Sequence, residues 1–162
     1  MVMNMHPHLL IFGFGYTAHF LAKKAAKMNI QVTGTTRNKE HLGYDSSTEC
    51  RVIHFSEHSI DKALESATHI LISTPPTQDF ADPVLKEYKE LLKTYHKTIQ
   101  WIGYLSSTSV YGDHQGNWVD ESSKANTPGS QGILRLSAEE QWITFAKEQQ
   151  LPLTIFRLAG IY

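Results

Sequence analysis

A glycine-rich turn near the start of the chain has the residue types and spacing that bind a pyrophosphate. Residues 13–18 read Gly-x-Gly-x-x-Ala between a short apolar run and a stretch with helical periodicity. The first glycine permits a tight turn, the second lets the backbone approach the phosphates, and the small last residue lets the helix pack on the strand. The helix N-terminus attracts phosphate through its N–H groups and dipole, without a basic side chain. A plain tight turn is the alternative; the expected cofactor contacts are Gly13, Gly15, Tyr16 and Thr17.

The residues that end the second apolar run favour a cofactor with a 2′-phosphate. A protein that binds NAD usually has Asp or Glu about twenty residues after the turn, to hold the ribose 2′-hydroxyl. This chain has Thr36 and Arg37 in that region. A carboxylate would repel a 2′-phosphate, whereas the planar guanidinium can bind it through paired hydrogen bonds. We therefore expect NADP(H) to be preferred over NAD(H), with a solvated surface arginine as the alternative.

Two more candidate cofactor contacts, Ser73 and Thr74, follow a later apolar run. They stand directly before Pro75 and Pro76, which form a stiff turn. Ligands of open parallel sheets bind outside the carboxyl ends of the strands, which is where this turn is expected.

The elements that must position these residues follow from the hydrophobic rhythm of the chain. Short apolar runs alternate with helical repeats, which predicts an α/β fold: a Rossmann doubly wound parallel sheet of about six strands in one domain, residues 1–162. The expected strands are 9–12, 31–35, 51–55, 69–73, 101–106 and 153–158. The expected helices are 17–28, 61–67, 83–96 and 132–149, the last with Ile133, Leu136, Ile143 and Ala146 facing inward. The irregular segment 111–131 is long enough to be a functional or mobile loop.

The composition excludes several classes of protein. With 41% hydrophobic and 19% charged residues among 162, the chain can bury a core, and disorder is not expected. The net charge of −1 gives no basic field for nucleic acid or an anionic membrane. The single cysteine, Cys50, cannot form an internal disulfide, which favours the cytoplasm. Glycines interrupt the first apolar run and no basic residue precedes it, so we expect neither a signal peptide nor a membrane span.

Three motifs resemble one superfamily of enzymes. Besides the glycine turn, residues 104–112 read Tyr-Leu-Ser-Ser-Thr-Ser-Val-Tyr-Gly and residues 156–162 read Phe-Arg-Leu-Ala-Gly-Ile-Tyr. From Leu9 to Tyr162 the chain resembles the extended and atypical short-chain dehydrogenases/reductases, in particular the NAD(P)-dependent nucleotide-sugar epimerase/dehydratase-like branch. The resemblance implies that Ser107, with Thr108 beside it, polarises the oxygen of a substrate.

At the acid/base position the chain departs from this family. Family members have a Tyr about two dozen residues after the serine, and four residues further a Lys that lowers the phenol pKa and holds the nicotinamide ribose. Here Gln131 stands at the Tyr position and Arg135 at the Lys position. An amide does not shuttle protons near neutral pH, whereas Arg135 can still hold ribose hydroxyls. Two titratable residues lie nearby in the sequence. We interpret Tyr111 as a structural residue and His114 as a solvated loop residue.

The resemblance also implies a longer protein. Family members continue past the last expected strand with a subdomain that closes over the substrate, so this chain is expected to lack most of that subdomain. Strand 153–158 would then leave apolar surface uncovered, which favours a homo-oligomer or a completing polypeptide.

Two functions remain open from the sequence. One is an NADP(H)-binding epimerase, dehydratase or reductase acting on a sugar-nucleotide or a related carbonyl or alcohol, with hydride transferred at a carbon whose oxygen lies at Ser107. The other is a non-catalytic NADP(H)-binding sensor or scaffold, which Gln131 favours. No metal is expected, because His54 and His58 need not share a face. Trp118 is expected to pin the long loop to the body, with stacking on a substrate as the alternative.

Overall fold

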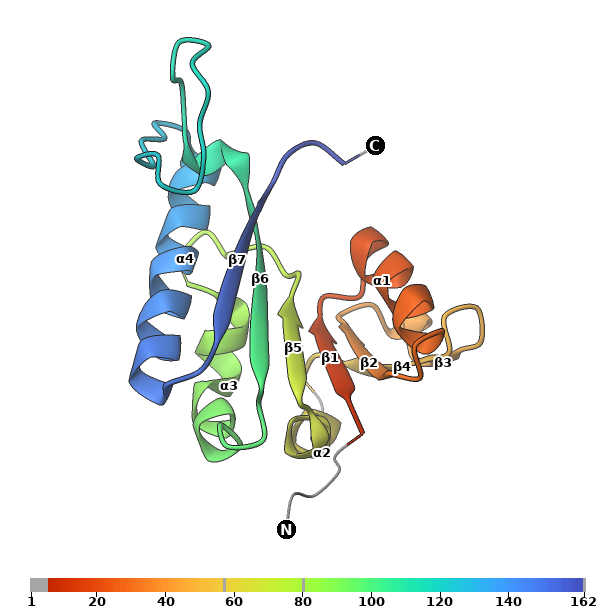
Figure 1. Ribbon diagram of the computed structural model, residues 1–162. Coiled ribbons are helices and arrows are strands. Elements are labelled where there is room, and N and C mark those ends of the chain that lie inside the picture. The colour runs from red at the N-terminus through yellow and green to blue at the C-terminus, as the bar shows by residue number, and fades with distance from the viewer. Residues whose placement is uncertain (1–5, 57, 80, 162) are drawn as a thin grey trace.

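One mostly parallel sheet organises the chain (Figure 1). The computed structural model describes residues 6–56, 58–79 and 81–161, and within them seven strands form a single sheet in the order β3-β4-β2-β1-β5-β6-β7. The strands are β1 (His8–Phe12), β2 (Gln31–Thr36), β3 (Gly43–Asp45), β4 (Cys50–His54), β5 (His69–Ile72), β6 (Trp101–Ser107) and β7 (Leu153–Leu158). The helices are α1 (Tyr16–Ala26), α2 (Ser59–Ser66), α3 (Pro83–Thr94) and α4 (Ser130–Gln149), with short 3₁₀ turns η1 (Lys39–His41) and η2 (Thr108–Val110).

The direction in which the strands are added reverses at β1. From β1 the chain adds β2 and β4 on one side, then crosses to add β5, β6 and β7 on the other, all of them parallel. This confirms the predicted doubly wound sheet, and the carboxyl edge beside β1 becomes the point where ligands bind in such sheets.

Helices cover both faces of the sheet, but unequally. One core cluster joins the sheet to α2, α3 and α4, and a second, smaller cluster joins the opposite face to α1 through Ala18, Ala22 and Ala25. Small side chains on α1 let the helix lie close to the strands, as their spacing in the sequence predicts. α1 therefore begins close to the carboxyl end of β1, with the glycine turn between the two elements (Figure 1).

The sequence missed one strand. β3 has three residues, lies at the sheet edge and pairs antiparallel with β4. Gly43 and Tyr44 are exposed and Asp45 is half-buried, so β3 has no hydrophobic pattern that a sequence could reveal. The six expected strands and four expected helices are present, with ends that differ from the expected ones by at most two residues.

The predicted inward face of α4 was partly wrong. Ile133 and Ile143 are 41% and 49% exposed and Leu136 is half-buried, whereas Ala146 is buried as expected. The buried stripe instead contains Leu134, Ala138, Trp142 and Phe145. Trp142 and Phe145 pack edge to face with ring centroids 5.8 Å apart, so the two largest apolar side chains of the helix determine which side is buried.

Candidate functional site

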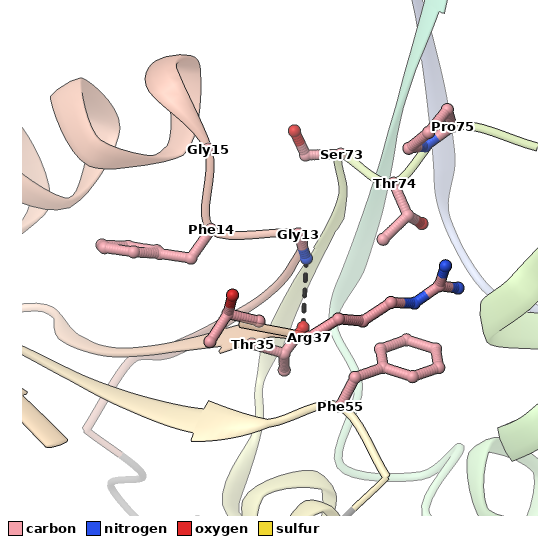
Figure 2. Close-up of a pocket in the computed structure, with 10 residues that line it drawn as sticks. Gly13, Phe14, Gly15, Thr35, Arg37, Phe55, Ser73, Thr74 and Pro75 are labelled. Atoms are coloured by element: carbon pink, nitrogen blue, oxygen red, sulfur yellow. Dashed lines mark hydrogen bonds between the residues drawn. The ribbon is translucent and has the colours of Figure 1, made fainter. Parts of the chain in front are cut away.

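A cavity of about 330 Å³ opens at the carboxyl ends of β1, β2, β4 and β5, beside the reversal of strand order (Figure 2). Six of the residues predicted from the sequence line it: Gly13, Gly15, Thr36, Arg37, Ser73 and Thr74. Two others do not, because Tyr16 and Thr17 lie in the first turn of α1 and Tyr16 faces a neighbouring cavity towards η1 and β3. Pro75 of the expected stiff turn also lines the first cavity, together with three residues that the sequence had not singled out: Phe14, Thr35 and Phe55.

Glycine stands at the two positions of the turn for different structural reasons. Gly13 has φ +90°, and a Cβ there would lie 3.0 Å from the Thr74 nitrogen, so both its conformation and its close approach to β5 require glycine. Gly15 has an ordinary extended conformation as the N-cap of α1, and no side chain caps that helix. A Cβ at Gly15 would meet no atom within 4 Å, so this side of the turn faces open space.

Thr35 of β2 holds the glycine turn through two hydrogen bonds. The N–H of Gly13 donates to Thr35 Oγ1 at 3.0 Å (Figure 2). The N–H of Phe14 donates to the Thr35 carbonyl oxygen at 2.7 Å. Thr35 is fully buried in β2. The sequence did not reveal this role because threonine is also an ordinary strand residue.

We expect Thr35→Val to weaken dinucleotide binding about tenfold. Valine keeps the shape of threonine but leaves the Gly13 N–H without its acceptor, a loss of about 1–3 kcal/mol. Calorimetric titration with NADP⁺ measures the change, and Thr35→Ser, which keeps the hydroxyl, serves as the matched control. Equal affinity in the valine variant would show that the turn does not need this hydrogen bond.

The opposite wall of the cavity offers a hydroxyl without a partner. Thr74 is 9% exposed, and its Oγ1 atom is buried with no hydrogen-bond partner among the described residues. Buried polar groups are rarely left unpaired, so an oxygen or hydroxyl of a ligand is a fitting partner here. The N-terminus of α1 is uncapped, and the space beside Gly15 is open. These features and the Thr74 hydroxyl suit the cavity to a nucleotide that carries phosphate.

The arginine predicted from the sequence lies at the mouth of the cavity. The exposed Arg37 side chain extends over the ring of Phe55, with its guanidinium carbon 5.3 Å from the ring centroid (Figure 2). Thr36 next to it accepts a hydrogen bond from the Asn38 N–H at 3.1 Å, which helps to form the bend before η1.

The residues predicted for catalysis lie at β6 and α4, and neither lines this cavity. Ser107 ends β6, and its Oγ accepts a hydrogen bond from the Ser109 N–H at 3.1 Å. Arg135 donates through Nη1 to the Leu105 carbonyl oxygen at 2.9 Å. Gln131 is exposed in the first turn of α4.

Behind Arg135 lies a buried polar cluster. Burial raises the pKa of Tyr104 to about 12, although the Arg135 charge acts in the opposite direction. Burial also raises the pKa of Asp82, the N-cap of α3, against the bonds it accepts from the first-turn N–H groups. Tyr104 is therefore a neutral phenol at neutral pH, and its complete burial keeps it away from any substrate.

A buried ion pair frames this region, and the sequence did not predict it. Glu139 of α4 is 1% exposed; it accepts from Ser106 Oγ and pairs with Arg157 of β7 at 2.9 Å. The Arg157 guanidinium also lies 4.9 Å from the ring centroid of Tyr111. Tyr111 is buried and so occupies the structural position expected of it. The pair ties α4, β6 and β7 together around the end of the strand that presents Ser107.

The long loop does not use its tryptophan as an anchor. Trp118 is 100% exposed, so the expectation that it pins the loop was wrong. The base of the loop is closed instead by the backbone, where the Asn126 N–H donates to the Tyr111 carbonyl oxygen at 3.3 Å. His114 is half-buried, and its ring lies nearly perpendicular to that of Tyr111 with the centroids 6.4 Å apart, so it is less solvated than expected.

Residue types that bind metals do not cluster in the part of the chain that the structure describes. The described residues contain no group of three or more His, Cys, Asp or Glu placed to hold a metal ion. His54 Nδ1 accepts the Ser56 N–H at 3.3 Å. Burial raises the pKa of Cys50 to about 12, which makes it an unreactive thiol. None of the helices within 6–56, 58–79 and 81–161 has the length and apolar character needed to cross a bilayer.

Comparison with known proteins gives matches among solved structures. Neither a protein-family model nor a curated protein sequence matches the chain. A conserved protein of unknown function from Silicibacter pomeroyi is 38% identical with a TM-score of 0.86, over 96% of this chain and 53% of that one. Vestitone reductase from alfalfa is 16% identical with a TM-score of 0.74 (93% and 56% covered). UDP-glucuronic acid 4-epimerase from Bacillus cereus, in complex with NAD, is 18% identical with a TM-score of 0.68 (96% and 56% covered).

The chain shares its fold with these structures, and the shared fold agrees with the doubly wound sheet that the sequence predicted. The Silicibacter pomeroyi protein is similar to the chain in sequence as well as in fold, whereas the likeness to the reductase and the epimerase is one of fold alone. The chain spans about half the length of these structures.

Proposed function

We propose that this domain binds a nicotinamide dinucleotide in the cavity at the glycine turn and prefers NADP(H) over NAD(H). The observation that carries the proposal is the turn itself: Thr35 fixes it, and α1 opens behind it without a cap. Thr74, whose hydroxyl has no partner among the described residues, lines the same cavity. The epimerase with a similar fold is described with NAD bound, which supports the class of ligand. In this assignment the backbone of Gly13 and Gly15 and the first turn of α1 hold the pyrophosphate.

The remaining lining residues divide between the two ends of the dinucleotide. Thr36 and Arg37 lie at the end of β2 and take the adenosine ribose with its 2′-phosphate. Ser73 and Thr74 line the β5 side and hydrogen-bond the ligand opposite the turn. Tyr16 and Thr17 contribute backbone N–H groups rather than side chains, because their side chains do not line this cavity.

Replacing Arg37 with glutamine is expected to remove the preference for NADP⁺. A charge-assisted bond from arginine to phosphate contributes about 1.5–3 kcal/mol, so NADP⁺ affinity should fall roughly 10- to 100-fold. NAD⁺ lacks the 2′-phosphate, and its affinity should stay within about twofold. Parallel titrations of both cofactors at one salt concentration measure this ratio; a wild-type protein that binds NAD⁺ equally well would remove Arg37 from the role.

The reaction we propose is hydride exchange with a sugar-nucleotide or a related carbonyl or alcohol. The bound nicotinamide supplies or accepts the hydride. Ser107 accepts the Ser109 N–H with its oxygen and so keeps its own proton available for a substrate oxygen. Arg135 remains cationic and is anchored at the Leu105 carbonyl, which leaves further N–H groups for ribose hydroxyls.

A second candidate is a non-catalytic NADP(H)-binding sensor or scaffold. The exposed Gln131 favours it, because an amide at the position of the family tyrosine cannot donate a proton to the substrate.

Absorbance at 340 nm separates the two candidates. Turnover of NADPH or NADP⁺ with a panel of sugar-nucleotides and simple carbonyl compounds supports the enzyme, and Ser107→Ala should then lower kcat about 100-fold without changing the Kd of the cofactor. Binding without turnover across the panel supports the sensor or scaffold. A protein that binds no nicotinamide dinucleotide contradicts both.

A further inference from the structure

Phe55 is a rigid platform beside the cavity. It directly follows β4, is 7% exposed, and its ring packs edge to face against Phe12 and Tyr88 at centroid distances of 6.2 and 5.3 Å. Its backbone is fixed as well, because its N–H donates to the Thr36 carbonyl oxygen at 2.9 Å and its own carbonyl oxygen accepts the Tyr88 hydroxyl. The ring therefore cannot shift without disturbing β2, β4 and α3.

The Arg37 guanidinium lies on the exposed side of this platform. Its carbon is 5.3 Å from the Phe55 ring centroid, within the range of a cation–π contact. Within the described part of the chain, the guanidinium makes this ring contact and no hydrogen bond or ion pair. A guanidinium that lies over a ring keeps its N–H groups available for the paired hydrogen bonds that a phosphate accepts.

This arrangement fixes the side chain before a ligand arrives. An exposed arginine ordinarily loses much rotamer freedom when it binds a phosphate. Stacking on a ring that is itself held by the core removes part of that freedom in advance. The backbone hydrogen bond from Phe55 to Thr36 also fixes the backbone of Phe55 relative to that of Arg37, because Thr36 is the residue before Arg37.

We infer that Phe55 is a positioning residue that holds Arg37 ready for a nucleoside 2′-phosphate, so that the site discriminates a 2′-phosphoadenosine group through the pair Phe55 and Arg37. The inference rests on the proposed function and deepens it. Phe55 acts through Arg37 and not as a direct contact of the phosphate.

The test compares two ligands that differ only in the 2′-phosphate. Adenosine 2′,5′-bisphosphate and adenosine 5′-monophosphate are titrated into the whole chain by calorimetry at constant ionic strength. In Phe55→Leu we expect the ratio of the two affinities to fall about fivefold, with the monophosphate affinity within about twofold of the wild type. Phe55→Tyr retains the aromatic face and should retain the ratio.

Two further variants control for damage to the core. Phe145→Leu makes the same substitution in the same core cluster, but beside Trp142, and should leave the ratio unchanged. Phe55→Met fills the space with a flexible apolar chain and replaces Phe55→Leu if the leucine variant does not show a cooperative melting transition.

The outcomes are distinct. An unchanged ratio in Phe55→Leu and Phe55→Met overturns the inference. An equal loss of affinity for both ligands also overturns it, because the ring would then support the base and not Arg37. A wild-type protein that binds both ligands equally overturns it while leaving dinucleotide binding intact. Failure of the wild type to bind either ligand or NADP⁺ is instead a failure of the proposed function.

Discussion

Gly15→Asp is expected to abolish dinucleotide binding and to leave the domain at least as stable as the wild type. Gly15 is the N-cap of α1, and its backbone conformation is open to any residue. Aspartate is a preferred N-cap and gains a few tenths of a kcal/mol over glycine there. The same carboxylate would stand where the pyrophosphate binds, and a charge pair about 4 Å apart at an effective dielectric constant of about 20 costs about 4 kcal/mol. Affinity should therefore fall by at least about 100-fold.

Thermal melting and calorimetric titration together measure these opposite effects. Gly15→Asn is the matched control, because asparagine caps a helix equally well and has nearly the same size without the charge. We expect its binding to lie between those of the wild type and Gly15→Asp. If Gly15→Asp bound NADP⁺ within about threefold of the wild type, the pyrophosphate could not lie at this turn.

Arg157→Met is expected to cause the largest loss of stability. The substitution leaves Glu139, which is 1% exposed, as a buried carboxylate without its partner. Breaking a buried ion pair in this way costs about 3–5 kcal/mol. For a domain of this size the melting temperature should fall by roughly 10 °C.

The double variant Glu139→Gln with Arg157→Met should recover much of the loss, because no charge then remains buried and the Ser106 hydroxyl can still donate to the amide oxygen. Lys86→Met is the comparison at the surface. It breaks the exposed pair with Asp79, and we expect no measurable change in melting temperature. A small effect of Arg157→Met, similar to that of Lys86→Met, would show that water reaches Glu139.

The sequence predicted the parts of the structure that leave a periodic pattern along the chain. Buried parallel strands are continuous apolar runs, and α1 has small residues at helical spacing, so both were recognised. The glycine turn was recognised for a related reason, because close approach at Gly13 permits no side chain. The cavity accordingly contains six of the eight cofactor residues expected from sequence.

The parts that were missed depend on contacts between distant residues. Thr35 supports Gly13 across two strands, and Phe55 supports Arg37 across β2 and β4; neither residue stands in a motif. Glu139 finds Arg157 only when β7 joins β6. Trp118 was misjudged because a large aromatic side chain favours burial on average, whereas backbone hydrogen bonds close this loop.

The three tryptophans give the domain a built-in set of optical reporters. Trp142 lies sealed in the core, Trp101 is half-buried with its indole N–H bonded to Thr154, and Trp118 stands wholly in water at the loop. Dissolved iodide should therefore quench Trp118 first and Trp142 last. Emission from Trp118 is the most red-shifted of the three, because its side chain is fully exposed to water. A change in that part of the spectrum would therefore report movement of the loop, with no dye attached to the protein.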